Sequence, residues 1–224
     1  MGKGIVSSGQ EREVSIPAGA VRLEGSLAIP GNVRGVVLFA HGSGSSRHSP
    51  RNRFVARELE KRALGTLLMD LLTAEEESVD AYTAHLRFDI RLLAQRLAAA
   101  TDWLTHEPEI AHLPAGYFGA STGAAAALVA AAERPDPVRA ILSRGGRPDL
   151  AGAALPKVQA PTLLIVGGAD TAVIRMNQEA LRELRVKSKL EIVPGASHLF
   201  EEPGALEQVA RLAGDWFEEH LIGG

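Results

Sequence analysis

Apolar residues along the chain recur with two different periods. Val21, Leu23 and Leu27 lie on one side of an alternating pattern with polar residues between them, which predicts a half-buried strand. Residues 14–16 predict a partner strand before it. Later segments are short continuous apolar runs, as expected of strands covered on both faces. These runs are residues 36–40, 66–69, 116–118, 138–142, 162–166 and 190–193.

Apolar residues spaced by three or four positions indicate helices between these strands. The longest series runs from Val79 to Leu104 and predicts one amphipathic helix, preceded by a solvated loop at the acidic residues 75–77. Further helices are predicted over residues 124–132, 173–184 and 205–221. Strands that alternate with helices predict an α/β domain, in which a mostly parallel sheet carries helices on both faces after an antiparallel start.

The length and composition fit one globular domain. Of the 224 residues, 46% are hydrophobic and 23% are charged, which are ordinary proportions. Residues 1–12 are predicted to be a flexible leader, because the first part of this segment is rich in glycine and serine and lacks the apolar core of a signal peptide. Residues 13–224 are predicted to form a single domain. A cytoplasmic location is the expectation that follows.

Charge and cysteine content exclude several classes of function. The 24 basic and 27 acidic residues leave a net charge of -3, which favours neither nucleic acid nor a membrane surface as a partner. No segment approaches the ~18 consecutive apolar residues of a membrane span. The chain has no cysteine, so disulfides, thiolate metal sites and a cysteine nucleophile are excluded.

The segment Gly119-Ala120-Ser121-Thr122-Gly123 follows a predicted buried strand and opens a predicted helix. This context is typical of a nucleophile elbow, a sharp strand-to-helix turn that holds a serine hydroxyl above the sheet edge. For the pentapeptide alone, a glycine-rich turn without catalytic function is the alternative. Ser121 is the candidate nucleophile, and a serine in this role needs a base.

Two later residues supply the partners of the serine in the chain order Ser, Asp, His. Asp170 follows the predicted strand 162–166, and His198 lies in the loop after the last predicted strand. Loops at the carboxyl ends of parallel strands meet at one sheet edge, which predicts a triad of Ser121, Asp170 and His198. Taken singly, Asp170 fits a helix N-cap and His198 a solvated loop residue. Asp149, after the preceding strand, is the alternative acid.

A second glycine-rich turn, His41-Gly42-Ser43-Gly44, follows the first central strand. A turn at this place can direct a backbone N–H at the carbonyl oxygen under attack. The N–H groups of Ser43 and Thr122 are therefore the predicted oxyanion hole. His41 is predicted to bond the loop rather than to carry a proton.

Arginines gather near the same predicted edge: Arg47, Arg51, Arg144 and Arg147. Arg47 and Arg144 are the candidates for binding a carboxylate of the substrate. The alternative, which we favour, is that these arginines form ion pairs with Asp70, Asp149 or each other's loops.

On these motifs the chain resembles the dienelactone-hydrolase-like branch of the α/β-hydrolase superfamily, and in particular the hydrolase domains that are fused to phosphoribosyltransferases. The matching segments are residues 41–47, 119–123, 143–150, 167–170 and 195–200. The resemblance implies the α/β-hydrolase fold, a catalytic triad and ester chemistry. Dienelactone hydrolases proper use a cysteine nucleophile, whereas this chain has Ser121, which implies a serine branch of the family.

Together these features predict a serine hydrolase that cleaves small carboxylic esters through an acyl-enzyme, with neither cofactor nor metal. The alternatives are an acyltransferase or perhydrolase with the same triad, and a hydrolase-fold binding module without activity. No helical lid is expected, because the connection between residues 142 and 162 is rich in glycine and proline. The expected partner is a small ester with a short acyl group, not nucleic acid or membrane, and the expected state is a monomer or a homodimer.

Overall fold

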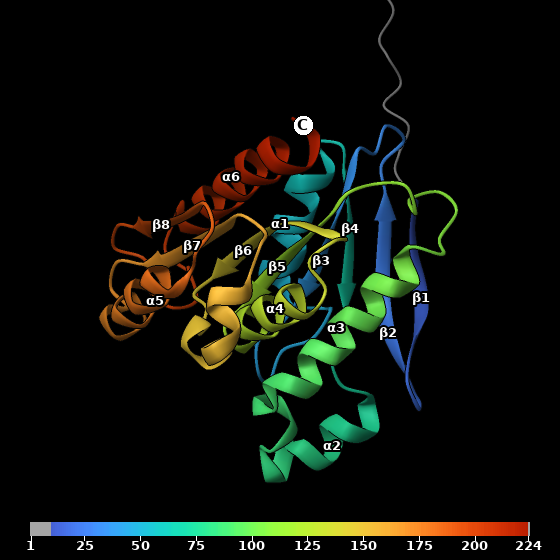
Figure 1. The fold of residues 1–224 in the computed structure, drawn as a ribbon, viewed down its shortest axis with the longest axis horizontal. Helices are drawn as coiled ribbons and strands as arrows, with labels where there is room; N and C mark the ends of the chain where they lie inside the picture. The colour runs from blue at the N-terminus through green and yellow to red at the C-terminus, as the bar shows by residue number, and fades with distance from the viewer. Residues whose placement is uncertain (1–9, 224) are drawn as a thin grey trace, which may run out of the picture.

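An eight-stranded sheet lies at the centre of the computed structural model, which describes residues 10–223 (Figure 1). The strand order is β1-β2-β4-β3-β5-β6-β7-β8. The pairs β1–β2 and β2–β4 are antiparallel and all other pairs are parallel, which confirms the predicted sheet with its antiparallel start. The strands are β1 (Gln10–Ala18), β2 (Val21–Ile29), β3 (Gly35–Ala40), β4 (Leu64–Met69), β5 (Ala115–Ala120), β6 (Val138–Arg144), β7 (Thr162–Gly167) and β8 (Ser188–Val193).

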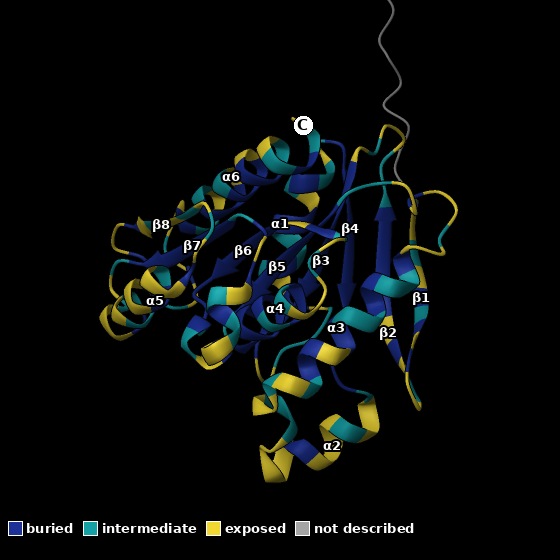
Figure 2. Ribbon diagram, in the orientation of Figure 1, coloured by how far each residue is buried: buried dark blue, intermediate teal, exposed yellow. Residues whose placement is uncertain are grey.

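Helices cover both faces of the sheet, as the alternation of strands and helices predicts. One face packs against α1 (Pro50–Glu60) and α6 (Ala205–Phe217), and the other against α3 (Ile90–Leu104), α4 (Thr122–Glu133) and α5 (Thr171–Glu183). The central strands are buried along their whole length (Figure 2). Because side chains of a strand alternate between faces, the sheet places a defined set of side chains toward each helical layer.

The first helix, α1, is absent from the prediction, although its start carries a recognisable signal. Ser49 caps it by accepting a hydrogen bond from the N–H of Asn52, and Pro50 occupies its first turn. Val55 and Leu59 are fully buried against the sheet. The helix matters for the site, because its N-terminus follows the loop at the end of β3.

The predicted single helix from Val79 to Leu104 is wrong. The chain forms α2 (Ala74–Thr83), a short 3-10 turn η1 (Leu86–Phe88) and then α3. Ala84 ends α2 in the left-handed region with a φ of 52°. The buried carboxylate of Asp80 accepts a hydrogen bond from the N–H of Leu86 at 2.6 Å, which replaces helical bonds across the break.

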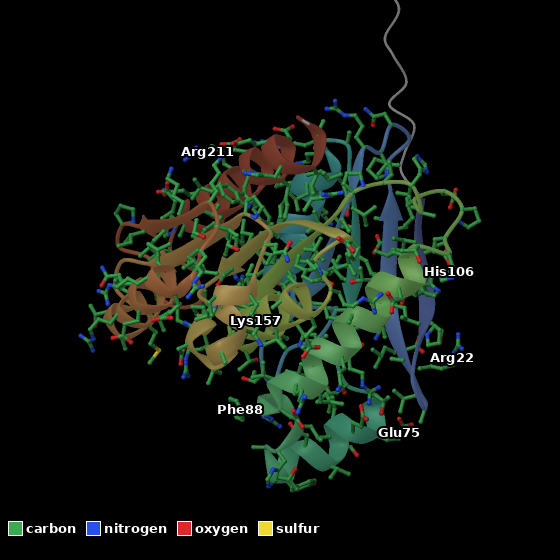
Figure 3. The ribbon with its side chains drawn as sticks, viewed as in Figure 1. Arg22, Glu75, Phe88, His106, Lys157 and Arg211 are labelled. Carbon is green, nitrogen blue, oxygen red and sulfur yellow. The ribbon has the colours of Figure 1, made fainter. Side chains whose placement is uncertain are left out.

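The predicted loop at residues 75–77 is also wrong, because these residues form the first turn of α2. Thr73 and Glu76 make a capping box, and acidic residues are favoured at a helix N-terminus. Together α2 and η1 project from the sheet beyond α3 (Figure 1). Glu75 and Phe88 lie at the two ends of this projection (Figure 3), most of which is exposed (Figure 2).

The remaining connections are short. The 3-10 segment η2 (Pro148–Lys157), kinked at Gly152, fills the glycine- and proline-rich connection between β6 and β7, and no lid is evident within the described residues. A π-helical turn, η3 (Glu218–Ile222), follows α6. Of the predicted leader, residues 10–12 belong to β1 instead, and residues 1–9 lie outside the described residues. No helix within residues 10–223 has the length and apolar character to cross a membrane.

Candidate active site

Ser121 is the single residue between β5 and α4, in a sharp turn at the carboxyl end of a central strand. Its φ of 50° and ψ of -122° lie in a region that side-chain-bearing residues rarely adopt. Two glycines make the turn possible. A Cβ on Gly119 would lie 2.4 Å from Cα of Ala124, and a Cβ on Gly123 would lie 2.2 Å from the carbonyl oxygen of Ala40. The predicted elbow geometry around Ser121 is therefore present.

Asp170 and His198 are joined directly, although they are far apart in sequence. Asp170 comes just after β7 and His198 lies in the loop after β8, and Nδ1 of His198 is 2.7 Å from Oδ2 of Asp170. An ionised aspartate accepts the proton of Nδ1–H, which leaves Nε2 of the neutral ring free to accept a proton. The His198 side chain is 41% exposed, so a substrate can reach it.

The alternative acid is occupied elsewhere. Both carboxylate oxygens of Asp149 accept hydrogen bonds from the guanidinium of Arg147, at 2.8 to 3.2 Å. The same hydrogen bonds raise the pKa of Arg147, because they favour its charged form. Asp149 therefore forms an ion pair within its own loop, while Asp170 contacts the histidine.

Ser121 and the His198 loop meet at the end of β6. The N–H of Ser121 donates to the carbonyl of Arg144 at 3.3 Å. A Cβ on the next residue, Gly145, would lie 3.5 Å from Cε1 of His198. Among the hydrogen bonds of residues 10–223, none joins Ser121 Oγ to His198 Nε2. Such bonds are often long in free enzymes and shorten when a substrate binds.

The loop after β3 lies against Ser121 from the other side. A Cβ on Gly42 would lie 2.9 Å from Cβ of Ser121, so only glycine fits there. The N–H of Ser43 donates to Oγ1 of Thr122 at 3.0 Å. Thr122 is the first residue of α4, where backbone N–H groups have no partner inside the helix. The two predicted oxyanion donors, Ser43 and Thr122, are thus adjacent.

His41 fixes this loop, as its predicted structural role requires. Nδ1 donates to the carbonyl of Gly42 at 2.9 Å, and Nε2 accepts from the N–H of Leu71 at 3.0 Å. Both ring nitrogens of this buried residue are used, so His41 has no free nitrogen for proton transfer.

The arginines at the edge divide into paired and unpaired groups. The Arg47 guanidinium forms an ion pair with Asp70, and its Nε lies 3.4 Å from a carboxylate oxygen of Glu13. The backbone N–H of Arg47 also donates to Asp70 at 2.7 Å. These contacts favour the structural alternative for Arg47. Arg144 differs, because it forms no ion pair within the described residues and its buried Nε and Nη1 make no hydrogen bond there.

A cavity of about 180 Å³ opens beside the predicted oxyanion donors. Ser43 and Thr122 form one wall, and Leu72 and Leu93 form an apolar wall. The outer wall comes from α2, whose Ala81 lines the cavity. This contribution was not predicted, because the single helix expected from Val79 to Leu104 lacks the break that separates α2 from α3. A partly apolar cavity next to the predicted oxyanion donors can receive the acyl group of an ester.

Polar residues also line this cavity. The Arg87 Nε donates to Asp80 at 2.6 Å, and both residues line the cavity. Burial opposes ionisation of Asp80, but the hydrogen bonds from Arg87 and from the N–H of Leu86 outweigh it and lower the pKa of Asp80. The hydrogen bonds of Asp80 thus connect α2 to η1, the projecting segment that lines the cavity.

Comparisons with known proteins bear on the family and the fold of the chain. A family model described as the dienelactone hydrolase family matches residues 24–220. The crystal structure of dienelactone hydrolase from Anabaena variabilis ATCC 29413 is 64% identical, with a TM-score of 0.94, over 96% of this chain and 99% of that chain. Est1E from Butyrivibrio proteoclasticus shares the fold, with a TM-score of 0.77 at 15% identity over 95% of this chain and 99% of its own.

Among curated proteins, relatives from two strains of Mycobacterium tuberculosis are 58% identical over 214 residues. They are provisionally named phosphoribosyl transferases. The match covers 96% of this chain but 47% of each relative, so the chain spans about half the length of these proteins. The family match, the fold and the close structural relative establish that the chain belongs to the dienelactone hydrolase family of α/β-hydrolases.

Proposed function

We propose that this hydrolase cleaves small carboxylic esters, with Ser121 as nucleophile, His198 as general base and Asp170 as the residue that orients the histidine. The observation that carries the proposal is the 2.7 Å hydrogen bond between Asp170 and His198, at the sheet edge where the strained Ser121 elbow projects. This bond sets the tautomer in which Nε2 can accept the serine proton. The membership of the chain in a hydrolase family adds support.

The reaction proceeds in two halves. The proton of Ser121 Oγ passes to His198 Nε2 while Oγ bonds to the ester carbonyl carbon. The bond from that carbon to the alcohol oxygen then breaks, and His198 returns the proton to the departing alcohol. In the second half, water gives a proton to His198 as its oxygen attacks the acyl carbon. The bond to Ser121 Oγ breaks, and the proton returns to the serine.

The carbonyl oxygen gains negative charge in each half and needs donors. The N–H groups of Ser43 and Thr122 are adjacent and supply them. In the free protein the Ser43 N–H already donates to the Thr122 hydroxyl. We infer that the substrate oxygen replaces this hydroxyl as the acceptor, so the donor is oriented before the substrate arrives. Donors of this kind typically contribute about 3 kcal/mol each to the transition state.

The cavity beside these donors limits the acyl group. Its volume of about 180 Å³ leaves room for a compact group rather than a long chain. Each buried methylene adds only about 0.8 kcal/mol of binding, and methylenes beyond the cavity stay in water and add little. We therefore propose a preference for short acyl groups, without activation by lipid interfaces.

Labelling with a fluorophosphonate tests the nucleophile directly, since this reagent phosphonylates activated serines. We expect the protein to be labelled at Ser121, the S121A variant to be unlabelled, and H198A to react far more slowly. Labelling of S121A at the wild-type rate would overturn the assignment. Product analysis of an activated ester with added alcohol or peroxide separates hydrolysis from acyl transfer: free acid as the main product supports hydrolysis, and a new ester or peracid as the main product overturns it.

A further inference from the structure

Arg144, the last residue of β6, is a buried cation without a partner. Its surface is 8% exposed, and its Nε and Nη1 atoms are shielded from solvent and make no hydrogen bond. Burial, together with the nearby positive charge of Arg51, lowers the pKa of Arg144 to about 10. Buried guanidinium groups in proteins are normally paired, so this arrangement needs an explanation.

The side chain of Arg144 points into the layer of α1 and α6. Along β6, Ala140 and Leu142 belong to the core on that face, whereas Ile141 belongs to the opposite core. Arg144 shares the face of Ala140 and Leu142, because alternate residues of a strand point the same way. It therefore lies under the sheet edge, toward the first turn of α1.

Arg51 approaches from that first turn. Its Nη1 donates to the exposed Glu201 at 3.2 Å, but its Nε is buried without a partner. Arg144 and Arg51 are thus two nearby like charges on the α1 side of the active-site edge, and each has a buried N–H donor without a partner. Bringing like charges together in a buried place is unfavourable unless a counter-charge joins them.

The other arginines of the edge are paired with carboxylates. Arg47 forms an ion pair with Asp70, and Arg147 with Asp149. Arg47 and Arg51 each have a buried Nε without a hydrogen bond, but each guanidinium is paired with a carboxylate. Among the described residues, Arg144 is the arginine of this edge that has no carboxylate partner, and its backbone lies beside Ser121, whose N–H donates to the carbonyl of Arg144.

We propose that Arg144 and Arg51 form a binding site for an oxyanion, a carboxylate or a phosphate group, at the α1 side of Ser121. A planar guanidinium offers paired N–H donors that match the oxygens of such groups. A water molecule could accept from one nitrogen, but only an anion also neutralises the charge of Arg144, because Glu201 pairs with Arg51 alone. The anion comes either from solution or from the substrate itself; the second source rests on the proposed ester hydrolysis, and the first does not.

Binding of inorganic phosphate tests the site independently of catalysis. Phosphate is titrated calorimetrically into the wild type, R144Q, R51Q and S121A at constant ionic strength, and the thermal midpoint is followed in parallel. We expect one phosphate per wild-type chain, binding at least about tenfold weaker in R144Q and R51Q, and unchanged binding in S121A. R139Q is the matched control, because Arg139 is an exposed residue of the same strand.

Absence of phosphate binding by the wild type, or equal binding by wild type, R144Q and R51Q, would overturn the site. R51Q keeps the test decisive if R144Q does not fold, since Arg51 is partly exposed. Two nitrophenyl esters identify the source of the anion. One carries a terminal carboxylate, and the other carries the methyl ester of that carboxylate. A preference for the charged ester that R144Q and R51Q abolish assigns the anion to the substrate. Equal turnover, together with phosphate binding, assigns it to solution and supports the same site.

Discussion

Nε2 of His41 accepts a hydrogen bond from the backbone N–H of Leu71 at 3.0 Å. Through its other nitrogen, the same ring holds the carbonyl of Gly42. One buried imidazole thus connects the loop after β3, which carries the predicted oxyanion donor Ser43, to the loop after β4. The position of that donor depends on a side chain that takes no part in the proposed chemistry.

Replacing His41 by Ala should lower kcat by about tenfold to a hundredfold, because the Ser43 donor loses its fixed position in the transition state. KM should change less, since Leu72 and Leu93 still line the cavity. Steady-state kinetics with a nitrophenyl acetate substrate measures both. His112→Ala serves as a control, as His112 is exposed. Wild-type kcat in the His41 variant would show that the loop holds its shape without the ring.

The assignment of the acid is tested by two amide substitutions. Asp170→Asn should reduce kcat by roughly 10³- to 10⁴-fold, because the amide favours the wrong tautomer of His198. Asp149→Asn should leave kcat nearly unchanged, because Asp149 contacts Arg147 rather than the histidine. The opposite pattern would transfer the acid role to Asp149.

The proposed acyl cavity predicts that turnover depends on the size of the acyl group. A substitution on the surface of α2 should change this dependence. Ala81 lines the cavity from the exposed helix α2, so Ala81→Phe should narrow it without disturbing the core. Turnover of a butyryl ester should fall by about tenfold relative to an acetyl ester, which is equivalent to about 1.4 kcal/mol. Thr83→Phe, on the same helix but outside the cavity lining, is the control. An unchanged acyl preference in Ala81→Phe would locate the acyl group elsewhere.

Most of the sheet and of the site could be predicted, because each depends on local sequence. A short apolar run between turns, such as residues 36–40, rarely forms anything other than a buried strand. Glycines on both sides of Ser121, and polar residues just beyond strand ends, indicate the loops of the site. Parallel strands then bring Asp170 and His198 to one edge.

Other features depend on contacts between residues that local patterns do not reveal. The apolar spacing from Val79 to Leu104 continues through the break at Ala84, which exists because Asp80 turns back to bind the N–H of Leu86. The same break creates the wall of the acyl cavity. Likewise, no pattern distinguishes Arg144, which has no partner, from Arg47, which has one.

Asp80 gives a prediction for stability against pH. Its pKa is lowered in the folded protein, so its contribution to stability is full above its unfolded value near 4 and is lost as the pH falls through the folded value. Asp80→Asn should lower the thermal midpoint by a few degrees at pH 7, and the difference from wild type should shrink at about pH 3. Asp136→Asn, at an exposed position, should show no such pattern. A difference that stays constant with pH would mean that the carboxylate charge does not contribute.

The backbone of Ser121 predicts that activity and stability conflict at this residue. Its left-handed φ is easy for glycine and costly for serine, by about 1 to 3 kcal/mol. Ser121→Gly should therefore abolish turnover and raise the urea midpoint of unfolding, whereas Ser121→Ala should abolish turnover without that gain. Equal midpoints for the two variants would show that the turn is not strained.

The strain at Ser121 also bears on how such proteins change over generations. A copy of this gene released from selection for catalysis would gain stability from the first substitution that places glycine at the elbow. Genetic drift and selection for folding would then favour the same change, and the serine would be among the early losses. Its presence in this chain is what continued selection for chemistry would leave behind.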